Sequence, residues 1–213
     1  VVEGQTPWRR FASDFFENRL AIAGLGVFVL IALSAIFAPW ITPQDPYDLM
    51  QIDILDGRLP PGSSSGEMTY LLGTDDQGRD MLSGIFYGLR TSLSVGAAST
   101  LIALFLGGGV GLIAAYFGGR VDTVIMRIAD LQLSFPAILI ALILVSILGQ
   151  GIDKIIIALV GVQWAYYART IRGTALVERR REYIEAATCL ALSHRRIVFR
   201  HLLPNCTPPL IVV

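Results

Sequence analysis

The sequence predicts an all-α membrane protein, a polytopic helical bundle, and three observations support that prediction. Hydrophobic residues make up 54% of the 213 residues and charged residues only 16%, against roughly 25% charged residues in soluble domains. Several uncharged runs approach or exceed the roughly 20 apolar residues that a helix needs to cross the hydrocarbon core. Arginines gather in alternate segments between these runs, as in cytoplasmic segments. Because the formal net charge is zero, we predict no nucleic-acid partner.

Four complete spans and the start of a fifth are predicted. The first run, residues 20–41, is longer than the apolar stretch of a cleaved signal peptide, so we expect it to be retained. In the second run, 92–117, Gly107 and Gly111 have the spacing that lets helix backbones approach closely. Pro136 is expected to kink the third span. The remaining runs are 131–149, 155–171 and the start of a fifth span at 206–213.

The charges between the runs predict the orientation in the membrane. Eight arginines lie between residues 169 and 205 and three lie in the N-terminal segment 1–19, whereas the long segment 42–91 holds eight acidic residues against three arginines. Arginine-rich segments remain in the cytoplasm. We therefore predict that the N-terminus and the segment 172–205 are cytoplasmic and that 42–91 is external. Four predicted crossings also place the N-terminus and the segment 172–205 on the same side of the membrane. The near absence of ionisable residues within the runs argues against ion-coupled transport or a channel without ATP.

The external segment 42–91 contains a loop and a motif. Residues 59–66 are rich in proline, glycine and serine, which indicates a loop. A short amphipathic helix at the membrane boundary is expected from Met81 onward, capped by Thr74 or by one of the two aspartates after it. The acidic spacing matches no Ca²⁺ loop. The candidate site residues here are Gly73, Asp75, Asp76, Gly78, Arg79 and Asp80.

The cytoplasmic segment 172–205 predicts two short helices, 182–191 and 194–202. Ser193 is a plausible N-cap between them, and Pro204 is expected to end the second helix. An apolar stripe on the first helix either docks into a groove of a partner or packs within the same chain, and the sequence leaves both open. The stripe consists of Tyr183, Ile184, Ala187, Leu190 and Ala191.

Cysteines and histidines give little evidence of a site. Cys189 and Cys206 have no CxxC spacing, and we expect two small buried thiols in a reducing compartment. His194 and His201 are seven residues apart and have no metal-ligand partner at helical spacing, so no metal site is predicted. The glycine run of the second span is followed by no Gly-Lys-Ser/Thr, so no ATP hydrolysis by this chain is predicted.

The cytoplasmic segment resembles a known family. Glu185-Ala186-Ala187, then Ala191, Ile197 and Leu203-Pro204, are similar to the EAA signature of binding-protein-dependent ABC importer permeases. In that family the segment forms a coupling helix that docks on the ATP-hydrolysing subunit. The family usually has glycine at the position of Ala191, so how the turn is made here stays open. The resemblance implies a coupling site at Glu185, Ala186, Ala187, Thr188, Leu190, Ala191, Leu192 and Ser193.

Further segments resemble the dipeptide and oligopeptide permeases of the C type, within a group that also imports nickel and glutathione. They are Leu72 to Asp80, Tyr116 to Asp122, Phe135-Pro136-Ala137, Tyr183 to Ala187 and His201 to Asn205. The resemblance implies the type I ABC importer permease fold with six spans, and peptides as cargo.

The resemblance also implies partners and a location. A homologous second permease, two ATP-binding subunits, an external solute-binding protein and membrane lipid are the expected partners. This chain is expected to hold no cofactor and no catalytic residue, with ATP and Mg²⁺ bound by the partner subunits. The expected location is a bacterial or archaeal cytoplasmic (inner) membrane. Nickel or glutathione import is the alternative within the family, and an ATP-independent channel or secondary transporter is the alternative outside it.

Overall fold

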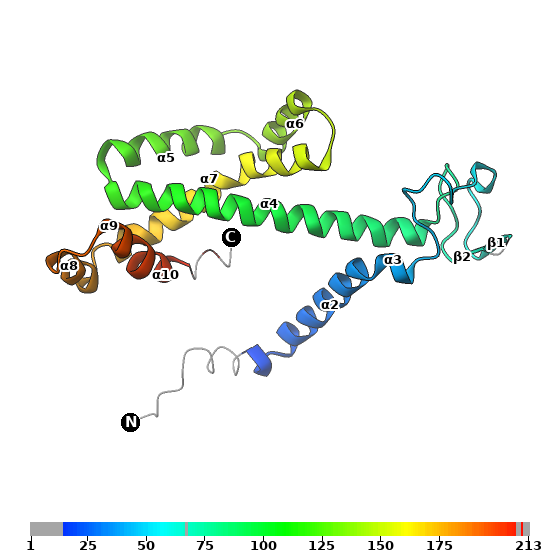
Figure 1. The fold of residues 1–213 in the computed structure, drawn as a ribbon, viewed down its shortest axis with the longest axis horizontal. Helices are drawn as coiled ribbons and strands as arrows, with labels where there is room; N and C mark the ends of the chain where they lie inside the picture. The colour runs from blue at the N-terminus through cyan, green and yellow to red at the C-terminus, as the bar shows by residue number, and fades with distance from the viewer. Residues whose placement is uncertain (1–14, 67, 208–209, 211–213) are drawn as a thin grey trace. The chain divides into compact units, whose positions relative to one another are not determined.

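The computed structural model describes residues 15–66, 68–207 and 210, and Figure 1 traces the fold. The chain forms two compact units, Val1–Ser94 and Val95–Val213, and the boundary falls inside the helix α4 (Met81–Phe117). The chain is predominantly helical, which confirms the predicted fold class. The predicted start of a fifth span lies largely outside the described residues.

In the first unit, the predicted span 20–41 is two helices, α2 (Arg19–Ile36) and α3 (Ala38–Ile41). Asn18 begins α2, because its side-chain oxygen accepts hydrogen bonds from two amides of the first turn, at 3.0 and 3.3 Å. Pro39 lies in the first turn of α3. It has no N–H to continue the hydrogen-bond ladder of α2, which accounts for the break between the helices.

The segment before α4 is more regular than predicted. It holds the turn η1 (Ile54–Asp56) and an antiparallel pair, β1 (Ser63–Ser65) and β2 (Met68–Tyr70). The prediction that residues 59–66 form a loop was wrong at β1, because a strand of three serines has no alternation of apolar and polar residues that would reveal it.

The predicted amphipathic helix and the second span form one element. They are the continuous 37-residue helix α4, so the expectation of a separate short helix was wrong. Neither proline nor a C-terminal glycine or asparagine stands between Leu89 and Ser92 to end a helix there.

In the second unit, the chain reverses after α4 into α5 (Gly119–Leu133), α6 (Ala137–Leu148) and α7 (Ile152–Glu178). The predicted third span, 131–149, is not one kinked helix, and it begins inside α5. The helix begins at Gly119, and α5 and α6 are bent by 93° across a break at 134–136, so Pro136 separates two helices instead of kinking one. Residues 118–130 fall between two predicted runs, but the acidic residues there pair with arginines of α7, Asp122 with Arg172 and Asp130 with Arg169.

Length and apolar composition identify candidate membrane spans among the described residues. Two helices, α2 and α4, meet both criteria, and the bent pair α5–α6 counts as a third if it is one span. The helix α7 contains the predicted fourth span, 155–171, and extends beyond it at both ends. That this helix crosses the membrane stays a prediction.

Small residues bring α4 and α7 into backbone contact. A methyl group on Gly107 would lie 2.2 Å from the carbonyl oxygen of Trp164, and one on Gly111 would lie 2.2 Å from that of Ala168. The predicted close approach at these two glycines is therefore confirmed. Both contacts advance in the same direction along the two helices, so α4 and α7 run parallel.

The last described elements are α8 (Glu182–Cys189), α9 (His194–Arg196), the π-helical turn η2 (Ile197–Leu202) and α10 (Leu203–Cys206). Helix at both predicted positions is confirmed, but Pro204 does not end the second one. The wide turn η2 precedes the proline, and Leu203 donates its N–H to Val198, one residue further back than in an α-helix. The carbonyl of His201 accepts a hydrogen bond from the Asn205 side chain at 2.8 Å.

Candidate functional site

The helix α8 has one face in the core of its own chain and one face exposed. Ile184 and Ala187 are 4% and 5% exposed, and they pack with residues of α4, α7, η2 and α10. Leu190 is 74% exposed. The predicted stripe therefore divides: its buried part packs within the chain, and its exposed part is free for a partner.

The remaining residues of the predicted coupling site follow the same division. Glu185, Ala186, Thr188, Ala191 and Ser193 are exposed, and Leu192 is half-buried. Ser193 precedes α9 but its side chain makes no capping hydrogen bond. Cys189 is exposed, contrary to the expectation of a buried thiol, whereas Cys206 is buried.

The turn after α8 is a Schellman motif with alanine where glycine is usual. Ala191 donates to the carbonyl of Thr188 at 2.9 Å, and Leu192 donates to that of Ala187 at 3.2 Å, the two bonds of that motif. Ala191 has φ +52°, a left-handed conformation that costs a residue with a side chain about 1–2 kcal/mol. The chain thus makes the turn by accepting strain.

Replacing Ala191 by glycine is expected to stabilise this turn. Removing the methyl group relieves the left-handed strain, and the greater freedom of glycine in the unfolded chain offsets part of the gain, leaving about 1 kcal/mol or less. Hydrogen exchange of the α8 amides should slow. Ala186→Gly, in the middle of the same helix, should instead speed exchange because glycine weakens a helix by roughly 0.5–1 kcal/mol. Equal effects of the two changes would contradict the assignment.

Tyr183 fixes α8 to the end of α7 and to α10. Its hydroxyl donates to the carboxylate of Glu178 at 2.7 Å and accepts from Asn205 at 3.1 Å. Burial, and then the hydrogen bond to Glu178, raise the pKa of the Tyr183 hydroxyl. The hydroxyl therefore remains a donor, and α8 is fixed by a directional bond as well as by apolar packing.

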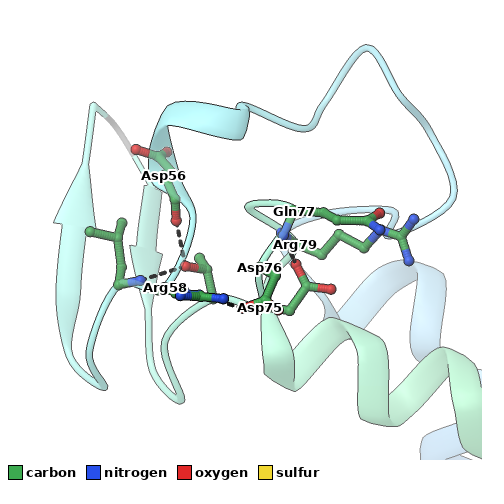
Figure 2. A network of polar contacts seen from close by, with 8 residues as sticks. Asp56, Arg58, Asp75, Asp76, Gln77 and Arg79 are labelled. Atoms are coloured by element: carbon green, nitrogen blue, oxygen red, sulfur yellow. Dashed lines mark hydrogen bonds and ion pairs between the residues drawn. The ribbon is translucent and has the colours of Figure 1, made fainter.

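The motif at residues 72–80 forms a tightly folded turn (Figure 2). Asp75 accepts hydrogen bonds from the amides of Gln77 and Arg79, at 2.8 and 3.0 Å, and Asp76 forms an exposed ion pair with Arg58. The cap of α4 is Asp80, which accepts from the Ser83 amide at 2.8 Å. The expectation that Thr74, Asp75 or Asp76 caps this helix was therefore wrong, because Asp75 is engaged within the turn.

Two glycines of the motif lie where no side chain fits. A methyl group on Gly73 would lie 2.3 Å from the carbonyl oxygen of Leu59, and one on Gly78 would lie 1.9 Å from that of Asp53. Both glycines have positive φ. Thr74 connects the same two backbone segments, because its hydroxyl donates to the carbonyl oxygen of Asp56 and accepts from the Leu59 amide. The motif residues thus serve folding, and of the six predicted site residues in the motif only Asp76 is exposed.

Polar residues that the sequence gave no reason to single out connect α5 with α7. Gln132 donates to the carbonyls of Gly161 and Val162, at 2.7 and 3.0 Å, and accepts from the Trp164 indole at 2.7 Å. A lone glutamine at the end of a predicted helix has no partner that spacing reveals. Among the described residues no group of three or more potential ligands is arranged to hold a metal.

Comparisons with known proteins match most of the chain. Residues 107–213 match the family of binding-protein-dependent transport system inner membrane components, and residues 6–61 match the N-terminal membrane domain of oligopeptide transport permease C. The chain is 37% identical to the di/tripeptide transport system permease protein DppC of Pseudomonas aeruginosa, over 97% of this chain and 68% of that protein.

Two further relatives carry different cargo names. The chain is 37% identical to the glutathione transport system permease protein GsiD of Pectobacterium atrosepticum, over 98% of this chain and 67% of that protein. It is 35% identical to the oligopeptide transport system permease protein OppC of Bacillus subtilis, over 96% of this chain and 65% of that protein. The chain thus spans about two thirds of the length of these relatives.

Proposed function

Because the chain belongs to the family of binding-protein-dependent transport system inner membrane components, we propose that it is a permease subunit of an ATP-driven importer of di- or oligopeptides. Relatives named for dipeptides, di/tripeptides and oligopeptides match nearly the whole chain. The glutathione permease matches equally well, and glutathione is itself a tripeptide derivative, so it is the second candidate cargo. Members of this family are multi-pass proteins of the inner membrane.

The observation that supports the mechanism is the two-faced helix α8. Its buried face joins Leu112 and Ala115 of α4 and Ile171 of α7 in one core cluster, so a displacement of α8 would move those helices. Its exposed face presents Ala186 and Leu190 to a partner. In this proposal an ATP-binding subunit contacts the exposed face, and ATP-driven motion of that subunit switches the opening of the pathway.

The proposal includes the rest of the importer. A second, homologous permease would form the other half of the pathway, two ATP-binding subunits would bind ATP and Mg²⁺, and an external binding protein would deliver the cargo. The N-terminus and α8 would be cytoplasmic, supported by the arginine content of both segments. The parallel arrangement of α4 and α7 fits this orientation, because both helices would then end on the cytoplasmic side near α8.

Cross-linking from Cys189 tests the contact with the ATP-binding subunit. Cys189 lies at the exposed end of α8, whereas Cys206 is buried, so within this chain a maleimide carrying a photoreactive benzophenone should label Cys189 in preference to Cys206. Illumination is expected to join the chain to a polypeptide that mass spectrometry identifies as an ATP-binding subunit. Cys189→Ser retains Cys206 and should give no product. Capture of a protein without a nucleotide-binding domain would contradict the proposal.

A further inference from the structure

A tyrosine and a histidine far apart in the sequence meet beside the coupling segment. Tyr116 lies in the last turn of α4, and His194 is the first residue of α9. The Tyr116 hydroxyl and Nδ1 of His194 share a hydrogen bond. The two rings pack edge to face, with centroids 5.6 Å apart and an interplanar angle of 72°. The end of a long helix is thereby joined to the residue that follows the predicted coupling site.

Arg179 brings a third element to the same place. It follows the last residue of α7, and its Nη1 donates to the carbonyl oxygen of Ala115 at 3.0 Å. Its guanidinium lies 6.0 Å from the centroid of the Tyr116 ring, within the range of a cation–π interaction. The Tyr116 ring is therefore held from α7 while its hydroxyl contacts α9.

The hydrogen bond differs in kind from the apolar contacts of α8. Ile184 and Ala187 contact the core through non-directional packing. The hydrogen bonds of Tyr183 reach α7 and α10 but not α4. A hydrogen bond has a preferred distance and angle. Only Leu192 and Ser193 separate the turn at Ala191 from His194, so a displacement of α8 reaches His194 through a short connection.

We propose that Tyr116 is a positioning residue that transmits the displacement of the coupling segment to α4 through its hydrogen bond to His194. The inference rests on the proposed function, since it assumes that a partner displaces α8. It assigns to His194 the role of a mechanical connection, and it makes the bond between these two side chains necessary for tight coupling between ATP hydrolysis and transport.

The test measures ATP hydrolysed per dipeptide transported, in proteoliposomes that contain the complete importer and its binding protein, with radiolabelled alanyl-alanine as the probe. Tyr116→Phe keeps the ring contacts and removes the hydroxyl. A hydrogen bond contributes about 1 kcal/mol, so the ratio is expected to rise about five-fold. His194→Ala should give the same rise, and the double variant should add nothing further.

Two controls separate transmission from folding. His194→Asn keeps a hydrogen-bonding atom near the position of Nδ1 and should restore the ratio to within about two-fold of the wild type. Tyr166→Phe removes a hydroxyl from a partly exposed tyrosine of α7 and should leave the ratio unchanged. Thermal unfolding of each complex is measured in parallel.

The outcomes are distinct. An unchanged ratio in Tyr116→Phe, with or without a lower melting temperature, would overturn the inference while uptake by the wild-type complex upheld the proposed function. Absence of any ATP-binding subunit from the wild-type complex would overturn the proposed function and the inference with it.

Discussion

Gly111→Ala is expected to separate α4 from α7 and to destabilise the second unit by about 3 kcal/mol or more. The added methyl group would lie 2.2 Å from the carbonyl oxygen of Ala168 and 2.8 Å from its carbonyl carbon. Backbone atoms cannot rotate away as a side chain can, so the two helices must move apart. Gly107→Ala, which meets the Trp164 carbonyl at 2.2 Å, should have a similar effect.

Gly109→Ala is the matched control on the same helix. A methyl group there meets no atom within 4 Å among the described residues, and alanine favours a helix over glycine by about 1 kcal/mol. The folded fraction after detergent extraction, measured by size-exclusion chromatography over a temperature series, should fall sharply for Gly111→Ala and stay level for Gly109→Ala. Similar curves for the two variants would show that α4 and α7 are not in backbone contact.

Gly78→Ala should prevent the turn at residues 72–80 from forming. Its φ of +81° costs alanine about 1–2 kcal/mol, and the methyl group would lie 1.9 Å from the carbonyl oxygen of Asp53. Gly62 also has φ +81°, but no atom of the described residues lies within 4 Å of a methyl group added there. Gly62→Ala therefore introduces the backbone strain but not the clash. The difference between the two variants measures the effect of the clash.

Limited proteolysis of the purified protein measures the difference. Cleavage within residues 42–80 should become much faster in Gly78→Ala and should change only slightly in Gly62→Ala. If both variants resisted the protease equally, the close approach of Gly78 to Asp53 would be wrong. Each variant differs from the wild type at one residue only, so a difference in cleavage rate can be assigned to that residue.

The apolar runs were sufficient to predict the helical class and the positions of α2, α4 and α7. They failed where charges were paired at long range. Residues 118–130 fall between two predicted runs, yet Asp122 and Asp130 in this stretch lie on α5 and pair with Arg172 and Arg169. Single-sequence patterns cannot show a partner 50 or 39 residues away, and so they did not reveal that residues 119–133 form a helix.

The candidate sites were predicted as segments, but their division into buried and exposed faces was not. The spacing of Ile184, Ala187 and Leu190 indicated one stripe, and the structure buries the first two and exposes the third. Which part of a stripe is covered depends on α4, α7 and α10, whose arrangement around α8 is a tertiary property. The left-handed conformation of Ala191 could not be predicted from the sequence either, because alanine, unlike glycine, gives no sign of it.

The backbone contact between α4 and α7 determines how the stability of this helix pair responds to cooling. Helices in lipid associate through dispersion and weak hydrogen bonds between close backbones, with little contribution from water release. The stabilisation that comes from releasing water off apolar surfaces weakens on cooling, whereas the dispersion attraction does not. If α4 and α7 both cross the membrane as predicted, their cohesion at Gly107 and Gly111 should be nearly independent of temperature. Cooling should then loosen the water-facing packing of the protein before it loosens this pair.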